Sequence, residues 1–215
     1  MATKRSQRIG IWVIAGIMLI GTIGGFIAMV VAPGNAARDQ AALDEQYNQW
    51  IKAEDEWLGK INDRYYPTFS QFTSRVGEFN AQDVSELKTE DLLVGSGDEV
   101  NGETKFATFY VGWTPDGEIF DQSVNTDRLD EPIEIDGLSS GGLIKGWIDG
   151  LVGMKIGGVR ELTIPADLAY GESGTQGIPP NTPLKFIVMA VDWPFDEPRP
   201  EMPPLVKKEF ERYAG

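Results

Sequence analysis

Apolar residues follow three different patterns along the chain, and the first is an unbroken run near the N-terminus. Segment 9–32 contains no charged side chain and is rich in Ile, Val, Gly and Met. At about 1.5 Å per residue, a helix of this length crosses a hydrocarbon core of roughly 30 Å. A cleaved signal peptide has a shorter apolar region, about 7–15 residues. Segment 9–32 is therefore predicted to be a transmembrane anchor, with a cleaved signal as the alternative.

Charges beside the anchor predict its orientation. Lys4, Arg5 and Arg8 lie in segment 1–8, which contains no acidic residue. Basic residues tend to stay on the cytoplasmic side of a membrane span, so the N-terminus is expected in the cytoplasm. Residues 33–215 are then expected on the other side of the cell membrane, in the extracellular or periplasmic space.

The second pattern is helical and amphipathic. From Ala36 to about Arg64 the sequence is charged and rich in Ala, and its apolar residues share one stripe at 100° per residue. The stripe consists of Leu43, Tyr47, Trp50, Ile51, Trp57, Leu58 and Ile61. Tyr65-Tyr66-Pro67 is expected to end the helix. Residues 33–86 are therefore predicted to be a helical spacer and a connector, with a further short helix around Phe69–Phe79.

Two interpretations of the spacer helix stay open. Its apolar side packs on the following domain or on a neighbouring segment, or the helix serves in dimerisation or at a membrane surface. Glu54 lies inside the stripe and weakens a coiled-coil interpretation. Weak self-association through the anchor or the spacer helix therefore stays open.

The third pattern begins at residue 87 and is typical of β structure. Three stretches dense in β-branched and aromatic residues predict strands: Thr104–Trp113, Val159–Ile164 and Leu184–Trp193. Pro115-Asp116-Gly117 predicts a hairpin turn. Leu143–Leu151 is a short apolar run between glycines, and a helix this short persists only when other elements cover it. Residues 87–193 are therefore predicted to be an α+β domain, an antiparallel sheet around one short helix, followed by a Pro-rich tail, 194–215.

Composition excludes several classes of function. The formal net charge of -14 argues against a nucleic-acid partner, because phosphate binding requires clustered Lys and Arg. The chain contains no Cys and no His, so it lacks a thiol nucleophile, the commonest general base and the commonest metal ligand. We therefore expect no metal site and no cofactor, and any reaction must proceed without these groups.

Five short motifs occur in an order and spacing that point to one protein family. They are Tyr110–Trp113, Asp116–Ser123, Ile144–Leu151, Ile164–Gly171 and Ile178–Phe186. In this register the chain resembles the FKBP-type peptidyl-prolyl cis-trans isomerases over residues 87–193, about half of its length. The resemblance implies an FKBP-like antiparallel sheet wrapped around one short helix. It also implies an enzyme, a rotamase that acts on X-Pro bonds of proline-containing polypeptides.

The resemblance further implies an apolar substrate pocket. Trp147 would form the floor beneath a proline ring, and the surrounding walls would come from Tyr110, Phe120, Ile144 and Phe186. Three further apolar residues would contribute to substrate binding, and they are Ile133, Leu143 and Ile178. Ile133 stands where the family usually has an aromatic wall residue, and Leu143 replaces a common valine, so substrate preference is expected to differ within the family.

The residues implied to be catalytic are Tyr110, Asp121, Ile144 and Tyr170. Asp121 would be a buried or half-buried carboxylate at the rim of the pocket. The Tyr170 hydroxyl would face a substrate carbonyl, and the backbone N–H of Ile144 would bind another. The loop Glu172–Gly177 is one residue shorter than in small cytosolic members of the family, and it lacks their histidine.

This activity is compatible with the composition, because turning an amide bond requires no covalent bond to the substrate and hence no nucleophile. The sequence therefore favours a membrane-anchored isomerase that assists the folding of exported or surface proteins. One alternative is a binding module or holdase for proline-containing segments with little turnover. Another is a structural membrane protein that uses the fold as a spacer.

Overall fold

The structure is a computed structural model that describes residues 36–125, 127–139, 141–196 and 198–214. The predicted basic segment and transmembrane anchor lie outside these residues. Within the described ranges, no helix combines the length and the apolar character needed to cross a bilayer. The chain divides into two compact units, a larger one of Glu56–Arg199 and a smaller one of Met1–Asp55 with Pro200–Gly215.

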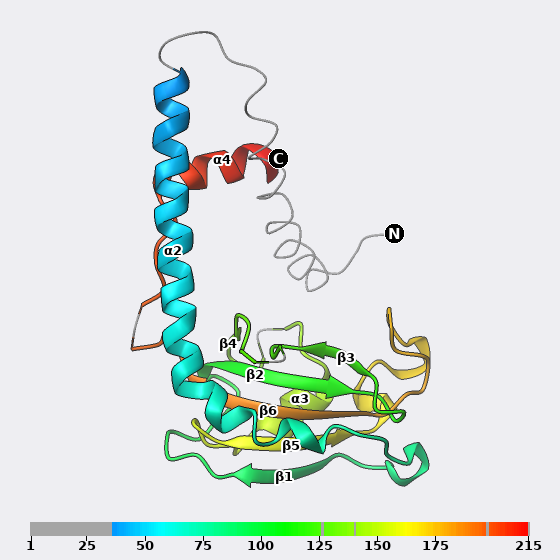
Figure 1. Cartoon of the computed structure of the whole chain (residues 1–215). Coiled ribbons are helices and arrows are strands. Elements are labelled where there is room, and N and C mark those ends of the chain that lie inside the picture. Colours follow the sequence, from blue (N-terminus) through cyan, green and yellow to red (C-terminus); the bar gives the residue numbers. More distant parts are fainter. Residues whose placement is uncertain (1–35, 126, 140, 197, 215) are drawn as a thin grey trace. The chain divides into compact units, whose positions relative to one another are not determined.

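The larger unit is built on a six-stranded antiparallel sheet with the spatial order β1-β5-β6-β2-β3, in which β4 also pairs with β2. One short helix, α3 (Lys145–Leu151), packs against one face of this sheet, as Figure 1 shows. The strands are β1 (Lys88–Leu93), β2 (Lys105–Trp113), β3 (Ile119–Gln122), β4 (Ile133–Asp136), β5 (Val159–Ile164) and β6 (Leu184–Asp192). The predicted antiparallel sheet and short helix are both confirmed.

Strand β2 supplies both faces of the core. Successive side chains of a strand point to opposite faces, so Phe106 and Tyr110 join the cluster around α3, whereas Phe109 and Val111 join a second cluster on the other face. All residues from Phe106 to Trp113 are buried. A strand that is buried throughout belongs to a sheet covered on both faces.

Two glycines allow α3 to approach strand β5 closely. A Cβ atom on Gly146 would lie 2.3 Å from Cγ2 of Ile164, and one on Gly150 would lie 2.9 Å from Cδ2 of Leu162. A side chain at Gly146 would therefore push the helix away from the sheet. The glycines that make α3 a poor helix in isolation are what permit its packing.

Arg160 of β5 holds the C-terminal end of α3. Its Nη1 donates hydrogen bonds to the carbonyl oxygens of Gly150, at 2.9 Å, and Val152, at 3.0 Å. Its Nε and Nη2 bind the two carboxylate oxygens of Asp91 in β1, at 2.6 and 3.1 Å. A cation at this position interacts favourably with the terminal carbonyls of a helix. Arg160 therefore links α3 to both β5 and β1.

The other face of the sheet is covered by the C-terminal part of α2 (Ala36–Phe69). Trp57, Ile61, Tyr65 and Phe69 are buried in the second cluster, against side chains of β2 and β6. The sequence left open whether the spacer helix packs on the following domain or serves in dimerisation or at a membrane surface. The C-terminal part of α2 packs on the domain.

The expected helix end at about Arg64 is wrong, because α2 continues to Phe69 with Pro67 inside its last turn. Proline removes one N–H donor from a helix. Burial of Tyr65 (7% exposed) and Phe69 (0% exposed) offsets that loss. The connector likewise differs from the short helix expected around Phe69–Phe79, and instead contains two 3₁₀ helices, Thr73–Arg75 and Ala81–Asp83.

An ion network fixes the connector to the sheet. The Glu161 carboxylate accepts from Nε of Arg75 at 2.7 Å and from Nζ of Lys185 at 2.8 Å. Glu161 is buried in β5, so the charge is compensated on both of its oxygens. The connector is thereby bound to β5, and the same Glu161 carboxylate is shared with Lys185 of β6.

The smaller unit contains the N-terminal part of α2 and the helix α4 (Pro204–Ala214). This helix covers the short amphipathic stretch in the tail. Val206 is 2% exposed and Tyr213 is 53% exposed, as expected for a helix with one apolar side.

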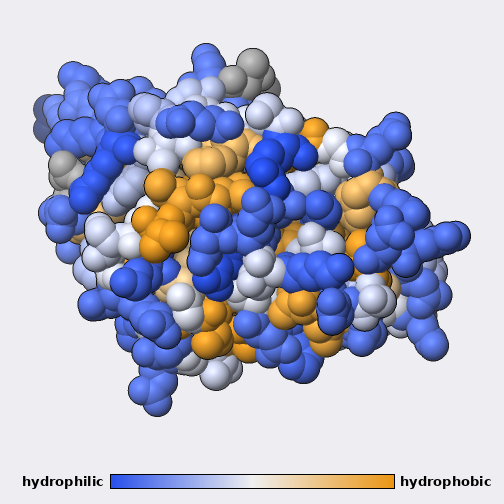
Figure 2. Space-filling model, turned by 90° about the horizontal axis from the view of Figure 1, so that it is seen from below, coloured by the Kyte–Doolittle hydropathy of each residue, from blue (hydrophilic) through white to orange (hydrophobic). Residues whose placement is uncertain are grey.

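Apolar side chains on the molecular surface are distributed over several patches. Figure 2 shows such patches separated by polar residues on one face. The exposed large apolar side chains of the larger unit are Leu93, Val94, Ile119, Ile133, Val152 and Tyr170. Scattered apolar residues are normal on a protein surface and need no ligand to explain them.

Phe69→Ala is expected to lower the free energy of unfolding by about 3–5 kcal/mol, because it removes the fully buried ring with which the end of α2 packs on the sheet. Ile51→Ala, on the same helix but 39% exposed, is the control and should change it by about 0.5 kcal/mol or less. Urea unfolding followed by tryptophan fluorescence measures both. Equal stability of Phe69→Ala and the parent would contradict the packing of α2 on the sheet.

Candidate active site

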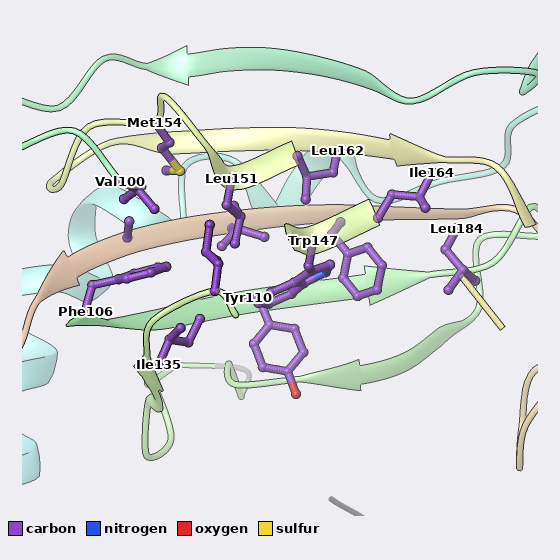
Figure 3. Packing of buried hydrophobic residues seen from close by; sticks show 14 of the residues in the cluster. Val100, Phe106, Tyr110, Ile135, Trp147, Leu151, Met154, Leu162, Ile164 and Leu184 are labelled. Carbon is purple, nitrogen blue, oxygen red and sulfur yellow. The ribbon is translucent and has the colours of Figure 1, made fainter. Parts of the chain in front are cut away.

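Four aromatic rings predicted to share a site lie together between α3 and the sheet. The Trp147 ring centroid is 5.4 Å from that of Tyr110 and 5.4 Å from that of Phe186, and Phe120 is 5.5 Å from Phe186. All three pairs are nearly perpendicular, an arrangement that aromatic rings favour at about 4.5–7 Å. Figure 3 shows Trp147 beside Tyr110, whose hydroxyl points away from the labelled core residues.

Gly112 of β2 makes room for this ring cluster. A Cβ atom on Gly112 would lie 2.5 Å from Cε1 of Phe186 and 2.8 Å from Cζ of Phe120. Gly112 was recognised only as part of a motif, and its role in the site was not predicted. The available signal was a glycine inside a β-rich stretch, which often marks a close approach of another group.

Ile144 begins the helix that carries Trp147. Its backbone is extended, with φ -68° and ψ 152°, and its carbonyl oxygen accepts from the N–H groups of Trp147 and Ile148 at 3.0 and 3.2 Å. Within the described ranges, the Ile144 N–H donates to no protein acceptor. Because Ile144 is only half-buried, this donor is available to a carbonyl group of a ligand.

Two tyrosine hydroxyls and one carboxylate form the polar edge of the cluster. Burial raises the pKa of Tyr110, and a hydrogen bond to Asp121 raises it further. Burial also raises the pKa of Tyr170, with a smaller contribution from the charge of Asp121. Both hydroxyls therefore stay protonated at neutral pH and can act as hydrogen-bond donors.

Asp121 is exposed, and the expectation of a buried or half-buried carboxylate is wrong. The physical reason is its place in the sheet. It lies on β3, which ends the strand order and pairs only with β2, so no further strand covers it. The exposed carboxylate nevertheless accepts a hydrogen bond from the Tyr110 hydroxyl.

The remaining predicted site residues divide into two groups. Ile178 is 3% exposed and belongs to the α3 cluster, and the half-buried Leu143 packs against that cluster. Ile133 does not belong to it, because it begins β4 opposite Thr108 and is 38% exposed. The structure therefore brings Ile178 and Leu143 into the cluster that contains the aromatic rings and leaves Ile133 outside it.

Ser123 is a further residue near the site that was not singled out from the sequence. Its N–H donates to the Tyr110 carbonyl at 2.8 Å, and its Oγ accepts from the Tyr110 N–H at 2.7 Å. Ser123 is 4% exposed. It therefore fixes the end of β3 to the strand that carries Tyr110.

The site is built from apolar rings and hydrogen-bond donors. Among the residues that the structure describes, no group of three acidic side chains gathers as a metal site would require. An antiparallel sheet around a short helix, with an aromatic cluster edged by tyrosine hydroxyls, defines an FKBP-like domain.

Comparison with the sequences of known proteins supports this class. Residues 97–191 match the family model described as FKBP-type peptidyl-prolyl cis-trans isomerase. The FK506-binding protein of Neisseria meningitidis serogroup B is 44% identical over 103 residues, which cover 47% of this chain and 91% of that protein. FK506-binding protein 4 of Dictyostelium discoideum is 44% identical over 108 residues, or 50% of this chain and 28% of that protein. The solved structure of FkpA from Escherichia coli shares 25% identity with a TM-score of 0.45, covering 89% of this chain and 83% of that one.

This chain belongs to the FKBP-type peptidyl-prolyl cis-trans isomerase family. It spans about a quarter of the length of the Dictyostelium relative, 28%. The helix α2 and the tail after β6 lie outside the residues that match the family model.

The raised pKa of Tyr110 predicts a pH dependence of stability. The folded-state pKa of Tyr110 lies above its ordinary value of 10.0, so the protonated hydroxyl contributes to the free energy of unfolding. This contribution is fully present well below pH 10 and is lost as the pH rises toward the folded-state pKa. Between pH 8 and pH 11 the parent should lose about 1.4 kcal/mol more of its unfolding free energy than Tyr110→Phe, which has no group to ionise at this position. Urea unfolding of both proteins at pH 8 and pH 11 measures this loss. If the difference in unfolding free energy between the two proteins is the same at pH 8 and pH 11, the pKa of Tyr110 is not raised.

Proposed function

We propose that this chain is an active peptidyl-prolyl cis-trans isomerase that accelerates rotation about X-Pro bonds. The observation that carries the proposal is the ring cluster of Trp147, Tyr110, Phe186 and Phe120, together with the Ile144 N–H, which donates to no acceptor among the residues that the structure describes. A proline ring would lie against Trp147, with the other rings around it.

An aromatic site of this kind favours the twisted amide over the planar one. Rotation faces a barrier of about 18–20 kcal/mol, and an X-Pro bond isomerises in about 10–100 s without a catalyst. The planar amide is polarised by resonance and well hydrated, whereas the twisted amide is less polar. A site that excludes water therefore disfavours the ground state relative to the transition state.

Hydrogen-bond donors at the edge would hold the substrate while the bond turns. The Ile144 N–H would bind one substrate carbonyl, and the Tyr170 hydroxyl would bind another. Asp121 would orient the Tyr110 hydroxyl through the hydrogen bond between them. Positioning lowers the barrier without any covalent step. Each 1.36 kcal/mol of transition-state stabilisation raises the rate about tenfold.

The proposed clients are exported or surface proteins. This part of the proposal rests on segment 9–32, which has the length and apolar character of a transmembrane anchor, and on the basic residues before it. An isomerase domain held outside the cell membrane would meet polypeptides as they emerge. Self-association through the anchor or α2 stays a prediction.

Tyr170→Phe is expected to slow X-Pro isomerisation several-fold, because it removes one hydroxyl, worth on the order of 1 kcal/mol, with little change of shape. Asp121→Asn should lose part of the rate for a similar reason. Tyr213→Phe in α4 is the matched control and should equal the parent. A protease-coupled assay on the full-length chain in mild detergent measures all four proteins.

Two results would overturn parts of this proposal. If the parent turns over well and both Tyr170→Phe and Asp121→Asn match it, the assigned roles are wrong. If the folded parent binds a proline peptide but does not speed its isomerisation, the chain is a binding module.

The expected topology is tested separately. Protease added to intact cells should remove the isomerase domain, because residues 33–215 are expected outside and Lys4, Arg5 and Arg8 inside. A cytoplasmic protein detected in the same sample serves as the control for lysis. Protection of the domain until the cells are broken would reverse the topology.

A further inference from the structure

The loop between β3 and β4, residues 123–132, connects two parts of the site. It begins just after Asp121 and ends at Ile133, and the strands at both of its ends pair with β2. The two ends of the loop therefore adjoin the strand that carries the Asp121 carboxylate and the strand that begins with Ile133.

Helix α2 binds this loop through the side chain of Asn62. The Asn62 Nδ2 donates to the Leu129 carbonyl oxygen at 3.0 Å, and the Leu129 N–H donates to the Asn62 Oδ1. One side-chain amide thus satisfies both main-chain groups of Leu129, as a neighbouring strand would. A second bond from Nδ2 to the Leu58 carbonyl, at 2.9 Å, fixes the Asn62 amide on its own helix.

The side chain of Leu129 is held by the same helix. It is 0% exposed and belongs to the cluster that contains Trp57, Ile61 and Tyr65 of α2. Glu131, further along the loop, forms an ion pair with Arg199, whose guanidinium carbon lies 5.7 Å from the Trp57 ring centroid. Hydrogen bonds and apolar contacts therefore connect this loop with α2 directly, and the Glu131–Arg199 ion pair connects it through the Trp57 ring.

Hydrogen bonds within the loop continue from Leu129 to the site. Leu129 forms an antiparallel bridge with Val124, and the Asp130 N–H donates to the Ser123 carbonyl at 2.9 Å. Ser123 in turn is bonded to both main-chain groups of Tyr110. The series of direct contacts from Asn62 to Tyr110 is continuous within the larger unit.

We propose that α2 is part of the substrate-recognition apparatus and that Asn62 is its positioning residue. By holding Leu129, Asn62 fixes the described part of the loop, residues 123–125 and 127–132, and thereby sets which residue before proline the site prefers. The inference rests on the proposed function, since selectivity is defined for X-Pro peptides. Ordering the loop before the substrate arrives removes an entropic penalty from binding.

The test compares Asn62→Ala with Asp63→Ala, an exposed neighbour on the same helix, in the full-length chain. Two peptides that differ only in the residue before proline, alanine or leucine, give a selectivity ratio of kcat/KM. Their affinity ratio is measured in parallel from the quenching of tryptophan fluorescence. Hydrogen exchange of the Leu129 amide reports directly on the contact, and urea unfolding gives the folded fraction.

Asn62→Ala is expected to change the selectivity ratio and to speed exchange of the Leu129 amide, each by roughly two- to tenfold. Asp63→Ala should leave both unchanged. Asn62→Asp keeps the acceptor for the Leu129 N–H but loses the donor, so it should retain part of the protection and of the selectivity.

Other results would overturn the inference. An unchanged Leu129 exchange rate would show that Asn62 does not hold the loop. A loss of kcat/KM that is equal for both peptides would show a role in stability alone. Absence of turnover in the parent would refute the proposed function, and the affinity ratio would then still decide whether Asn62 sets peptide selectivity.

Discussion

The structure depends on the burial of a helix that cannot exist alone. Helix α3 has seven residues, too few to be stable in water, and two of them are glycines. Its packing on β5 leaves no room for a Cβ atom at Gly146, and Arg160 supplies donors to its C-terminal carbonyl groups. The orientation of Trp147, and with it the ring cluster, follows from these contacts. The site is therefore positioned by the core itself.

Burial on the second face of the sheet extends the domain beyond the residues that match the family model. The C-terminal part of α2 covers this face, so β2 is buried from both sides along most of its length. A strand enclosed in this way has little freedom to shift, and β2 carries Tyr110. The helix that the sequence predicts to be a spacer is thus, in its last turns, a component of the core.

Local patterns predicted most of the elements, and the motif register predicted the ring cluster. The hairpin at Gly117, where φ is 79°, follows from its turn residues alone. Continuation of α2 past Pro67 was not predictable, because it depends on the distant sheet surface that buries Phe69. Exposure of Asp121 depends on β3 being an edge strand, and that is a property of the strand order. The contact of Asn62 with Leu129 joins positions 67 residues apart, and an asparagine on a helix carries no local sign of such a partner.

A site that acts by excluding water and holding its substrate needs accurate positions more than reactive groups. Tyr110 and Tyr170 both have a raised pKa, so their hydroxyls keep the same protonation across the physiological range and act as fixed donors. In the mechanism we propose, rate and selectivity depend on how firmly these groups are held. Ser123 holds the main chain of Tyr110, and the loop after Ser123 is in turn bound by Asn62. In such a site, residues far from the substrate affect turnover through geometry, without taking part in any chemical step.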